Sequence, residues 1–332
     1  MQKHLKFFGL IVFSTFIQNS EFPALQNIKQ ITFCSMGFEK AGEAYFNSDA
    51  SKIIFQAVPH GKKHYQIYVL DISSKKAQMV STGKGACTCA YFRPDDKKII
   101  FASSHEDPGV GAEDLEAPGY QRENKNYSWK FTPYMNVYEA DPDGSNLKAL
   151  TFGPAYKAEC AYSSDGLQIV FASNADGNMN LYIMNSDGTG MRQVTKDKNV
   201  YNGGPFFSPD NKRIIYRSDP DKKDYLQIYS MHVDGTDKQQ ITINGAVNWA
   251  PYWHPNGKVI AFTTSLHGHA NYQIYLLNII TNKTFRLTHG SSFDGLPTFS
   301  KDGKKILWTS KRGGDGNCQI FMADFILPGC LK

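Results

Sequence analysis

An aromatic residue followed by a polar turn recurs six times along the chain. The aromatic residues are Phe46, Phe92, Tyr162, Phe207, Trp253 and Phe299. Four of the five intervals between them are 45 or 46 residues, and the interval from Phe92 to Tyr162 is 70 residues. A repeat of this length is typical of the four-stranded blades of a β-propeller. The spacing therefore predicts six blades, with one insertion in the second blade.

Each copy has the pattern of a β-hairpin, and residues 205–218 show it most clearly. Apolar residues precede a Ser-Pro-Asp-Asn turn at 208–211, and a run rich in Ile and aromatic residues follows at 213–218. Pro209 fixes the φ angle required at the first corner, and Asn211 tolerates the left-handed conformation that returns the chain. The copies continue with a third strand and a short fourth strand that ends in Ser or Thr.

Only five of the short fourth strands follow their own blade. The missing one is predicted at the amino terminus, because residues 28–32 (Ile-Lys-Gln-Ile-Thr) have the same form as residues 238–242. Pairing this strand with the last blade removes two free sheet edges. We therefore expect an all-β fold, a six-bladed propeller of four-stranded antiparallel blades over residues 28–325. The expected blades are 42–82, 87–151, 156–195, 202–242, 247–288, and 293–325 completed by 28–33.

The repeated motifs carry a resemblance to a known family. The aromatic-Ser-Pro-Asp-Gly-Lys-Lys-Ile hairpin, the Gln-Ile-Tyr third strand, the Asp-Gly turn and the terminal Leu-Thr resemble the repeat of the TolB-like six-bladed β-propellers. Because fewer than 30 residues precede the first predicted strand, the chain is most similar to the stand-alone members, which lack the amino-terminal α/β domain of TolB. The resemblance implies a fold and leaves the activity open, because propellers serve many functions.

The first 20 residues have the pattern of a signal peptide. A basic segment at 1–6 precedes an uncharged apolar run at 7–17, which is much shorter than the roughly 20 residues needed to span a bilayer. We expect a secreted or periplasmic protein that does not span the membrane, with an uncleaved anchor or a buried first strand as the alternatives. The formal net charge of +5 is too small and too evenly spread to indicate nucleic-acid binding, and we expect a monomer.

Polar side chains are predicted to gather where the inner strands of the propeller begin. Glu43 and Glu159 lie three residues before the repeat aromatic, whereas Asn202, Asn248 and Asp294 lie five residues before it. With a period of two, both positions face the same side of a strand. Such oxygen donors could hold Ca²⁺ or the amino group of a ligand, and the alternative is a hydrated channel mouth. The complete predicted binding set is Glu43, Glu159, Asn202, Asn248, Trp249, Asp294, Arg217, Arg312, Tyr127 and Trp129.

Two of these residues, Tyr127 and Trp129, belong to the insertion at 105–134. A loop of this length in a compact domain is usually functional or disordered, and its aromatic residues favour a lid or a docking loop. His267 and His269, in another loop, lack an identifiable third metal ligand, so we expect them to be solvated.

The six cysteines allow one disulfide prediction. If residue 228 pairs with residue 242 in the hairpin centred near Gly235, copying that expected register onto the closing blade places Cys34 opposite Cys318, and Cys330 is an alternative partner. A bond between them would join both ends of the chain. The other three, Cys87, Cys89 and Cys160, are expected to remain buried thiols.

The chain contains no nucleophile elbow, zinc-protease motif, phosphate-binding loop or dinucleotide fingerprint. This favours a non-catalytic binding propeller that engages a protein, peptide or glycan through the channel mouth and the insertion. The alternative is a lyase, cyclase or hydrolase, with Glu43 or Glu159 as acid or base and Arg217 or Arg312 binding an anionic substrate.

Overall fold

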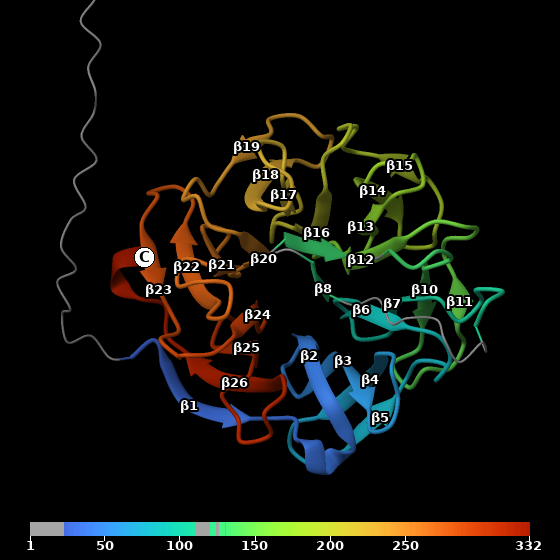
Figure 1. The fold of residues 1–332 in the computed structure, drawn as a ribbon, viewed down its shortest axis with the longest axis horizontal. Helices are drawn as coiled ribbons and strands as arrows, with labels where there is room; N and C mark the ends of the chain where they lie inside the picture. Colours follow the sequence, from blue (N-terminus) through green and yellow to red (C-terminus); the bar gives the residue numbers. More distant parts are fainter. Residues whose placement is uncertain (1–22, 111–119, 124–125, 130) are drawn as a thin grey trace, which may run out of the picture.

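The computed structural model describes residues 23–110, 120–123, 126–129 and 131–332. Six four-stranded antiparallel sheets radiate around a central channel (Figure 1), and the helical elements of the described residues are two short 3-10 turns, Cys34–Met36 and Gly329–Leu331. The expected all-β, six-bladed fold is confirmed. In the described residues, no helix has the length and apolar character needed to cross a membrane.

Blades one to five use their strands in chain order from the channel to the rim, and blade six takes its outermost strand from the amino terminus. Blades one and two contain β2 (Phe38–Phe46), β3 (Lys52–Pro59), β4 (Gln66–Asp71) and β5 (Ala77–Met79), then β6 (Cys87–Phe92), β7 (Ile99–Ser103), β10 (Asn136–Ala140) and β11 (Lys148–Ala149). Blades three and four contain β12 (Lys157–Tyr162), β13 (Gln168–Ser173), β14 (Asn180–Asn185) and β15 (Arg192–Gln193), then β16 (Asn202–Phe207), β17 (Arg213–Ser218), β18 (Gln227–His232) and β19 (Gln239–Gln240). Blade five contains β20 (Asn248–Trp253), β21 (Val259–Thr264), β22 (Gln273–Asn278) and β23 (Thr284–Arg286). Blade six contains β24 (Asp294–Phe299), β25 (Lys305–Ser310), β26 (Gln319–Phe325) and the amino-terminal strand β1 (Leu25–Gln30).

The second strand of each blade is packed on both faces. All five residues of β7 and all six of β21 are buried, and neither strand contains Pro or Gly. Ile, Val and aromatic side chains suit such a position because they pack well on a pleated surface. The core therefore lies between neighbouring blades, where apolar faces of adjacent sheets meet.

The ring closes through β1, which pairs with β26 as the outermost strand of the last blade (Figure 1). This confirms the predicted closure, with bounds a few residues earlier than expected. Gln30 pairs with Phe321, one residue away from the register that a Cys34–Cys318 bond needs, and the chain then turns at Cys34–Met36. The predicted disulfide is therefore wrong for this structure, in which Cys34, Cys318 and Cys330 are all free.

The Ser or Thr that ends each fourth strand ties that strand to the third. The Thr242 hydroxyl donates to Gln227 Oε1 at 2.9 Å and accepts the Ile228 N–H at 2.9 Å. Thr32 makes the same two bonds at the ring closure, to Gln319 Oε1 at 2.7 Å and from Ile320 N at 2.9 Å. Buried polar groups must be paired in this way to avoid a desolvation cost, which explains the terminal Ser or Thr of the repeat.

The insertion in blade two includes a hairpin of β8 (Tyr120–Glu123) and β9 (Asn126–Trp129). The side chains of Tyr127 and Trp129 lie outside the described part of the structure, as does the predicted signal peptide at 1–20. Phe131, just after the hairpin, packs on Tyr156 with ring centroids 5.0 Å apart. The carboxyl end of the insertion therefore reaches the channel.

Candidate functional site

All six inner strands contain a bulge at the same position. The residue three before the repeat aromatic has a positive φ, between 49° and 56°, and the pairing register shifts around it. These residues are Glu43, Cys89, Glu159, Gly204, Ala250 and Leu296. A bulge adds one residue to one strand and so reverses the alternation of side chains beyond it. The six bulge residues all line the channel mouth.

The residues two positions earlier face the blades instead. Asn202 and Asn248 are fully buried, and Asn248 Nδ2 donates to Gln227 Oε1 of the preceding blade at 2.9 Å. Asp294 accepts hydrogen bonds from Trp308 Nε1 at 3.1 Å and Arg312 Nη2 at 2.6 Å. The expectation that both positions share one face is wrong because of the bulge. The five oxygen donors proposed for Ca²⁺ are not brought together, and Arg312 is occupied by an ion pair within its own blade.

Glu43, Glu159, Arg217 and Trp249 do meet, in a cavity of about 290 Å³ at the channel mouth. Aromatic residues contribute to its wall, among them Tyr65, Phe131, Tyr156, Trp249 and Phe293. The sequence thus identified four of the lining residues and missed the other aromatic residues. Tyr156 and Phe293 share a position six residues before the repeat aromatic, which is a signal that could have found them, whereas Tyr65 and Phe131 lie outside the inner strands.

Glu159 is held by one cationic partner and two neutral hydrogen-bond donors. Its carboxylate forms an ion pair with Arg217 and accepts the Gly204 N–H at 2.6 Å and the Tyr201 hydroxyl at 3.1 Å. A Cβ atom at Gly203 would collide with Tyr201 and Glu159, and one at Gly204 would collide with Arg217. The Gly203-Gly204 pair therefore allows the ion pair to lie against the backbone of β16.

Glu43 lacks such a partner. Its carboxyl group is contacted by the Tyr45 hydroxyl at 3.3 Å and the Cys89 thiol at 3.9 Å. Burial, and after it the charge of Glu159, raise the pKa of Glu43, whereas Arg217 offsets part of this increase, and the resulting pKa is about 7. Burial also raises the pKa of Cys89, which keeps it a thiol. At neutral pH the cavity therefore holds one ion pair and one carboxyl group poised between its two forms.

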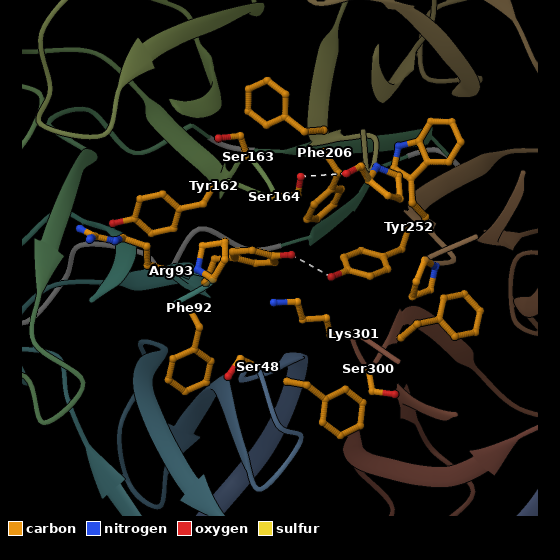
Figure 2. Close-up of a pocket in the computed structure, with 18 of the residues that line it drawn as sticks. Ser48, Phe92, Arg93, Tyr162, Ser163, Ser164, Phe206, Tyr252, Ser300 and Lys301 are labelled. Carbon is orange, nitrogen blue, oxygen red and sulfur yellow. Dashed lines mark hydrogen bonds between the residues drawn. The ribbon is translucent and has the colours of Figure 1, made fainter. Parts of the chain in front are cut away.

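An aromatic plug closes the floor of this cavity. Tyr45, Tyr91, Phe206 and Tyr252 pack against one another, and the hydroxyl groups of Tyr91 and Tyr252 are 2.8 Å apart. Each of the four immediately precedes a repeat aromatic, so the aromatic doublets of the sequence contain the signal that predicts the plug. The plug separates the channel mouth from a second cavity at the opposite face, shown in Figure 2.

The loop histidines are not among the residues that line this cavity. His267 Nε2 is 2.9 Å from the Tyr275 hydroxyl, and His269 Nδ1 is 3.1 Å from the Tyr272 hydroxyl. Across the part of the chain that the structure describes, no three His, Cys, Asp or Glu side chains are arranged to bind a metal ion.

Six four-stranded blades around a plugged channel define the molecule as a six-bladed β-propeller. The chain belongs to the TolB β-propeller domain family, whose model matches residues 144–270 and 245–326, together more than half of the chain.

Other proteins resemble this chain in sequence or in fold. The Tol-Pal system protein TolB of Francisella tularensis subsp. mediasiatica is 31% identical over 120 residues, a match that spans 34% of this chain and 27% of that protein. The structure of a putative TolB from Agrobacterium tumefaciens has a TM-score of 0.59 at 17% identity, over 86% of this chain and 91% of the other. An oligogalacturonate lyase from Vibrio parahaemolyticus has a TM-score of 0.55 at 14% identity, over 92% of this chain and 94% of the other. Identities this low indicate a shared fold and do not transfer an activity.

Proposed function

We propose that this protein is an exported, non-catalytic binding propeller that engages a protein, peptide or glycan at the channel mouth. The observation that carries the proposal is the aromatic-walled cavity with a closed floor, at the face where the insertion ends. Export is part of the proposal and rests on the basic and apolar pattern of residues 1–20.

The size of the cavity limits what enters it. A volume of about 290 Å³ is at the lower end of ligand pockets, roughly 300 to 1,000 Å³, and suits one side chain or one sugar ring. Aromatic walls such as Trp249 and Tyr65 offer flat surfaces for stacking, and Glu43 and Arg217 offer polar contacts that fix orientation. The rest of a larger ligand would lie across the face and contact the insertion.

The test uses arrays of defined peptides and glycans, probed with the full chain. Three variants are compared with wild type: Glu43→Gln, replacement of residues 111–130 by a short Gly-Ser linker, and Glu39→Gln as an exposed control. We expect captured ligands to lose affinity in the first two variants and to retain it in the control. Ligands that bind all variants equally would show that the mouth cavity and the insertion are not the binding surface.

A second candidate function is catalysis by Glu43. The pKa of Glu43 is about 7, and its carboxyl group shares the cavity with the Glu159–Arg217 ion pair. A pKa in this range suits a general acid or base at neutral pH. The array hits provide the test, because mass spectrometry of each hit after incubation reveals product. Turnover that is lost in Glu43→Gln while binding persists would favour the enzyme over the binding module.

A further inference from the structure

The cavity on the far side of the aromatic plug has a volume of about 180 Å³ and lies beneath the six Ser-Pro-Asp-type turns (Figure 2). The hydroxyl pair of Tyr91 and Tyr252 lies at its base, and Phe206 adds to its apolar wall. The second residue of every turn lines it, namely Ser48, Pro94, Ser164, Pro209, Pro255 and Lys301.

Neighbouring turns follow a rule that depends on whether this second residue has a backbone N–H. Where it is Ser, the fourth turn residue of the next blade supplies an acceptor: Asp96 accepts the Ser48 N–H at 2.9 Å, and Asn211 accepts the Ser164 N–H at 2.8 Å. Where it is Pro, no N–H needs an acceptor, and the next blade has Gly at that position, at 166, 257 and 303.

The junction between blades six and one breaks this rule. Lys301 has a backbone N–H, yet the fourth turn residue of blade one is Ala50, which has no acceptor. Within the described ranges, neither the backbone N–H nor the ammonium group of Lys301 has a hydrogen-bond or ion-pair partner. Figure 2 shows the Lys301 side chain among the residues that line the cavity, extended across the middle of the view.

The charge of the lining is one-sided. It includes Arg93 and Lys301 but no Asp or Glu. Arg93 is paired with Asp95 at 2.8 Å outside the lining, which leaves Lys301 as the cation without a carboxylate. An apolar cavity with an uncompensated cation at its edge is complementary to a ligand that has an apolar body and one negative charge.

We propose that this cavity is a binding site for a small aromatic carboxylic acid. The ring occupies the apolar space, which is close in size to a cavity of about 150 Å³ that accepts benzene in another protein. The carboxylate accepts hydrogen bonds from the backbone N–H and the ammonium group of Lys301. The Asp96 carboxylate provides the model for this contact, because it accepts hydrogen bonds from both the N–H and the hydroxyl of Ser48 at the junction of blades one and two. The ligand carboxylate takes the equivalent place at Lys301. This site is separate from the mouth cavity and does not depend on the function proposed there.

The probe is hydrocinnamate, titrated into the full chain and followed by NMR shifts of residues around the cavity. Phenylpropanol has the same ring and chain without the charge, and acetate has the charge without the ring. We expect saturable binding of hydrocinnamate and at least about tenfold weaker binding of the other two, because charge-assisted hydrogen bonds and ring burial are both needed.

Two matched pairs of variants localise the carboxylate. Ala50→Asp supplies an internal carboxylate to Lys301. The backbone at position 50 is left-handed, with φ of 56°, and an aspartate can adopt this conformation because Asp96 has a φ of 58° at the equivalent position. We expect at least about tenfold weaker hydrocinnamate binding in Ala50→Asp, and a change below about twofold in Ala50→Gly, which leaves the N–H free. Lys301→Gln is expected to weaken binding about fivefold, and Lys304→Gln, directly after the same turn and outside the lining, is expected to leave binding unchanged.

Three results would overturn the proposal. They are the absence of saturable hydrocinnamate binding, equal binding of hydrocinnamate and phenylpropanol, and equal affinity of the Ala50→Asp and Ala50→Gly variants with Lys301→Gln also unchanged. Far-UV circular dichroism of each variant confirms that the propeller is folded before affinities are compared.

Discussion

Glu43 and Glu159 occupy equivalent bulge positions in blades one and three, yet their surroundings differ sharply. Arg217, Tyr201 and the Gly204 N–H stabilise the charge of Glu159, whereas Glu43 has contacts to one hydroxyl and one thiol. The same backbone position therefore supports a fixed anion in one blade and a titratable group in another. This difference comes from the side chains that neighbouring blades contribute, and not from the repeat itself.

The raised pKa of Glu43 makes a prediction about stability and pH. The folded chain retains a proton on Glu43 between the ordinary glutamate pKa of 4.5 and about 7, whereas the unfolded chain releases it. Wild-type stability therefore falls as pH rises through this interval, and the Glu43→Gln variant lacks this loss. Relative to wild type, we expect Glu43→Gln to gain roughly 1 to 3 kcal/mol between pH 5 and pH 8, at about 1.4 kcal/mol per unit of pKa difference.

Urea denaturation at pH 5 and pH 8 measures this gain. Glu39→Gln, on the exposed part of β2, is the control and is expected to follow wild type at both values. A Glu43→Gln variant that keeps the wild-type difference between the two pH values would show that Glu43 titrates normally.

At the scale of the element, the inner strand explains which of the predicted residues lie at the channel mouth. The repeat aromatic and the spacing of Glu43 and Glu159 from it could be read from the sequence. The bulge that turns Asn202, Asn248 and Asp294 away from the channel could not be read from the sequence. A left-handed residue in a strand has no required residue type, and here it is Glu, Cys, Gly, Ala or Leu. Counting with a period of two therefore placed three buried, paired side chains in the channel.

The short fourth strand offers a test of what its terminal Ser or Thr contributes. Thr242→Val keeps the side-chain shape but removes the acceptor for the Ile228 N–H and the donor to Gln227. We expect a loss of about 1 to 3 kcal/mol in the free energy of unfolding, because a buried N–H is left without a partner.

Chemical denaturation measures the loss, and the exposed Thr281→Val serves as the matched control, expected within about 0.5 kcal/mol of wild type. Equal stability of both variants would mean that the hydroxyl bonds of the fourth strand do not stabilise the blade.

At the scale of the whole molecule, closure of the ring depends on residues from the two ends of the chain. The sequence predicted the closing strand because Ile28 to Thr32 repeats the form of another fourth strand. It did not predict the register, because the hairpin that served as the template has a different register from the expected one. That hairpin pairs Tyr229 with Gln240, and β26 and β1 copy it by pairing Phe321 with Gln30. The disulfide prediction failed for this reason, whereas the bonds of Thr32 to Gln319 and Ile320 formed as the repeat requires.

If β1 closes the ring, a chain that starts at Phe33 should be much less stable than one that starts at Pro23. The shorter chain loses the pairing of β1 with β26 and both bonds of Thr32, several hydrogen bonds at about 1 kcal/mol each, and exposes the edge of β26. We expect its melting temperature to fall by roughly 10 °C.

A synthetic peptide of residues 23–32 should restore stability by adding the missing strand to the free edge, and the same peptide with Thr32→Val should restore less of it. An unchanged melting temperature in the shorter chain would show that the other strands hold the ring without β1. A loss that the peptide does not reverse would mean that residues 23–32 act during folding and not as a strand of the finished sheet.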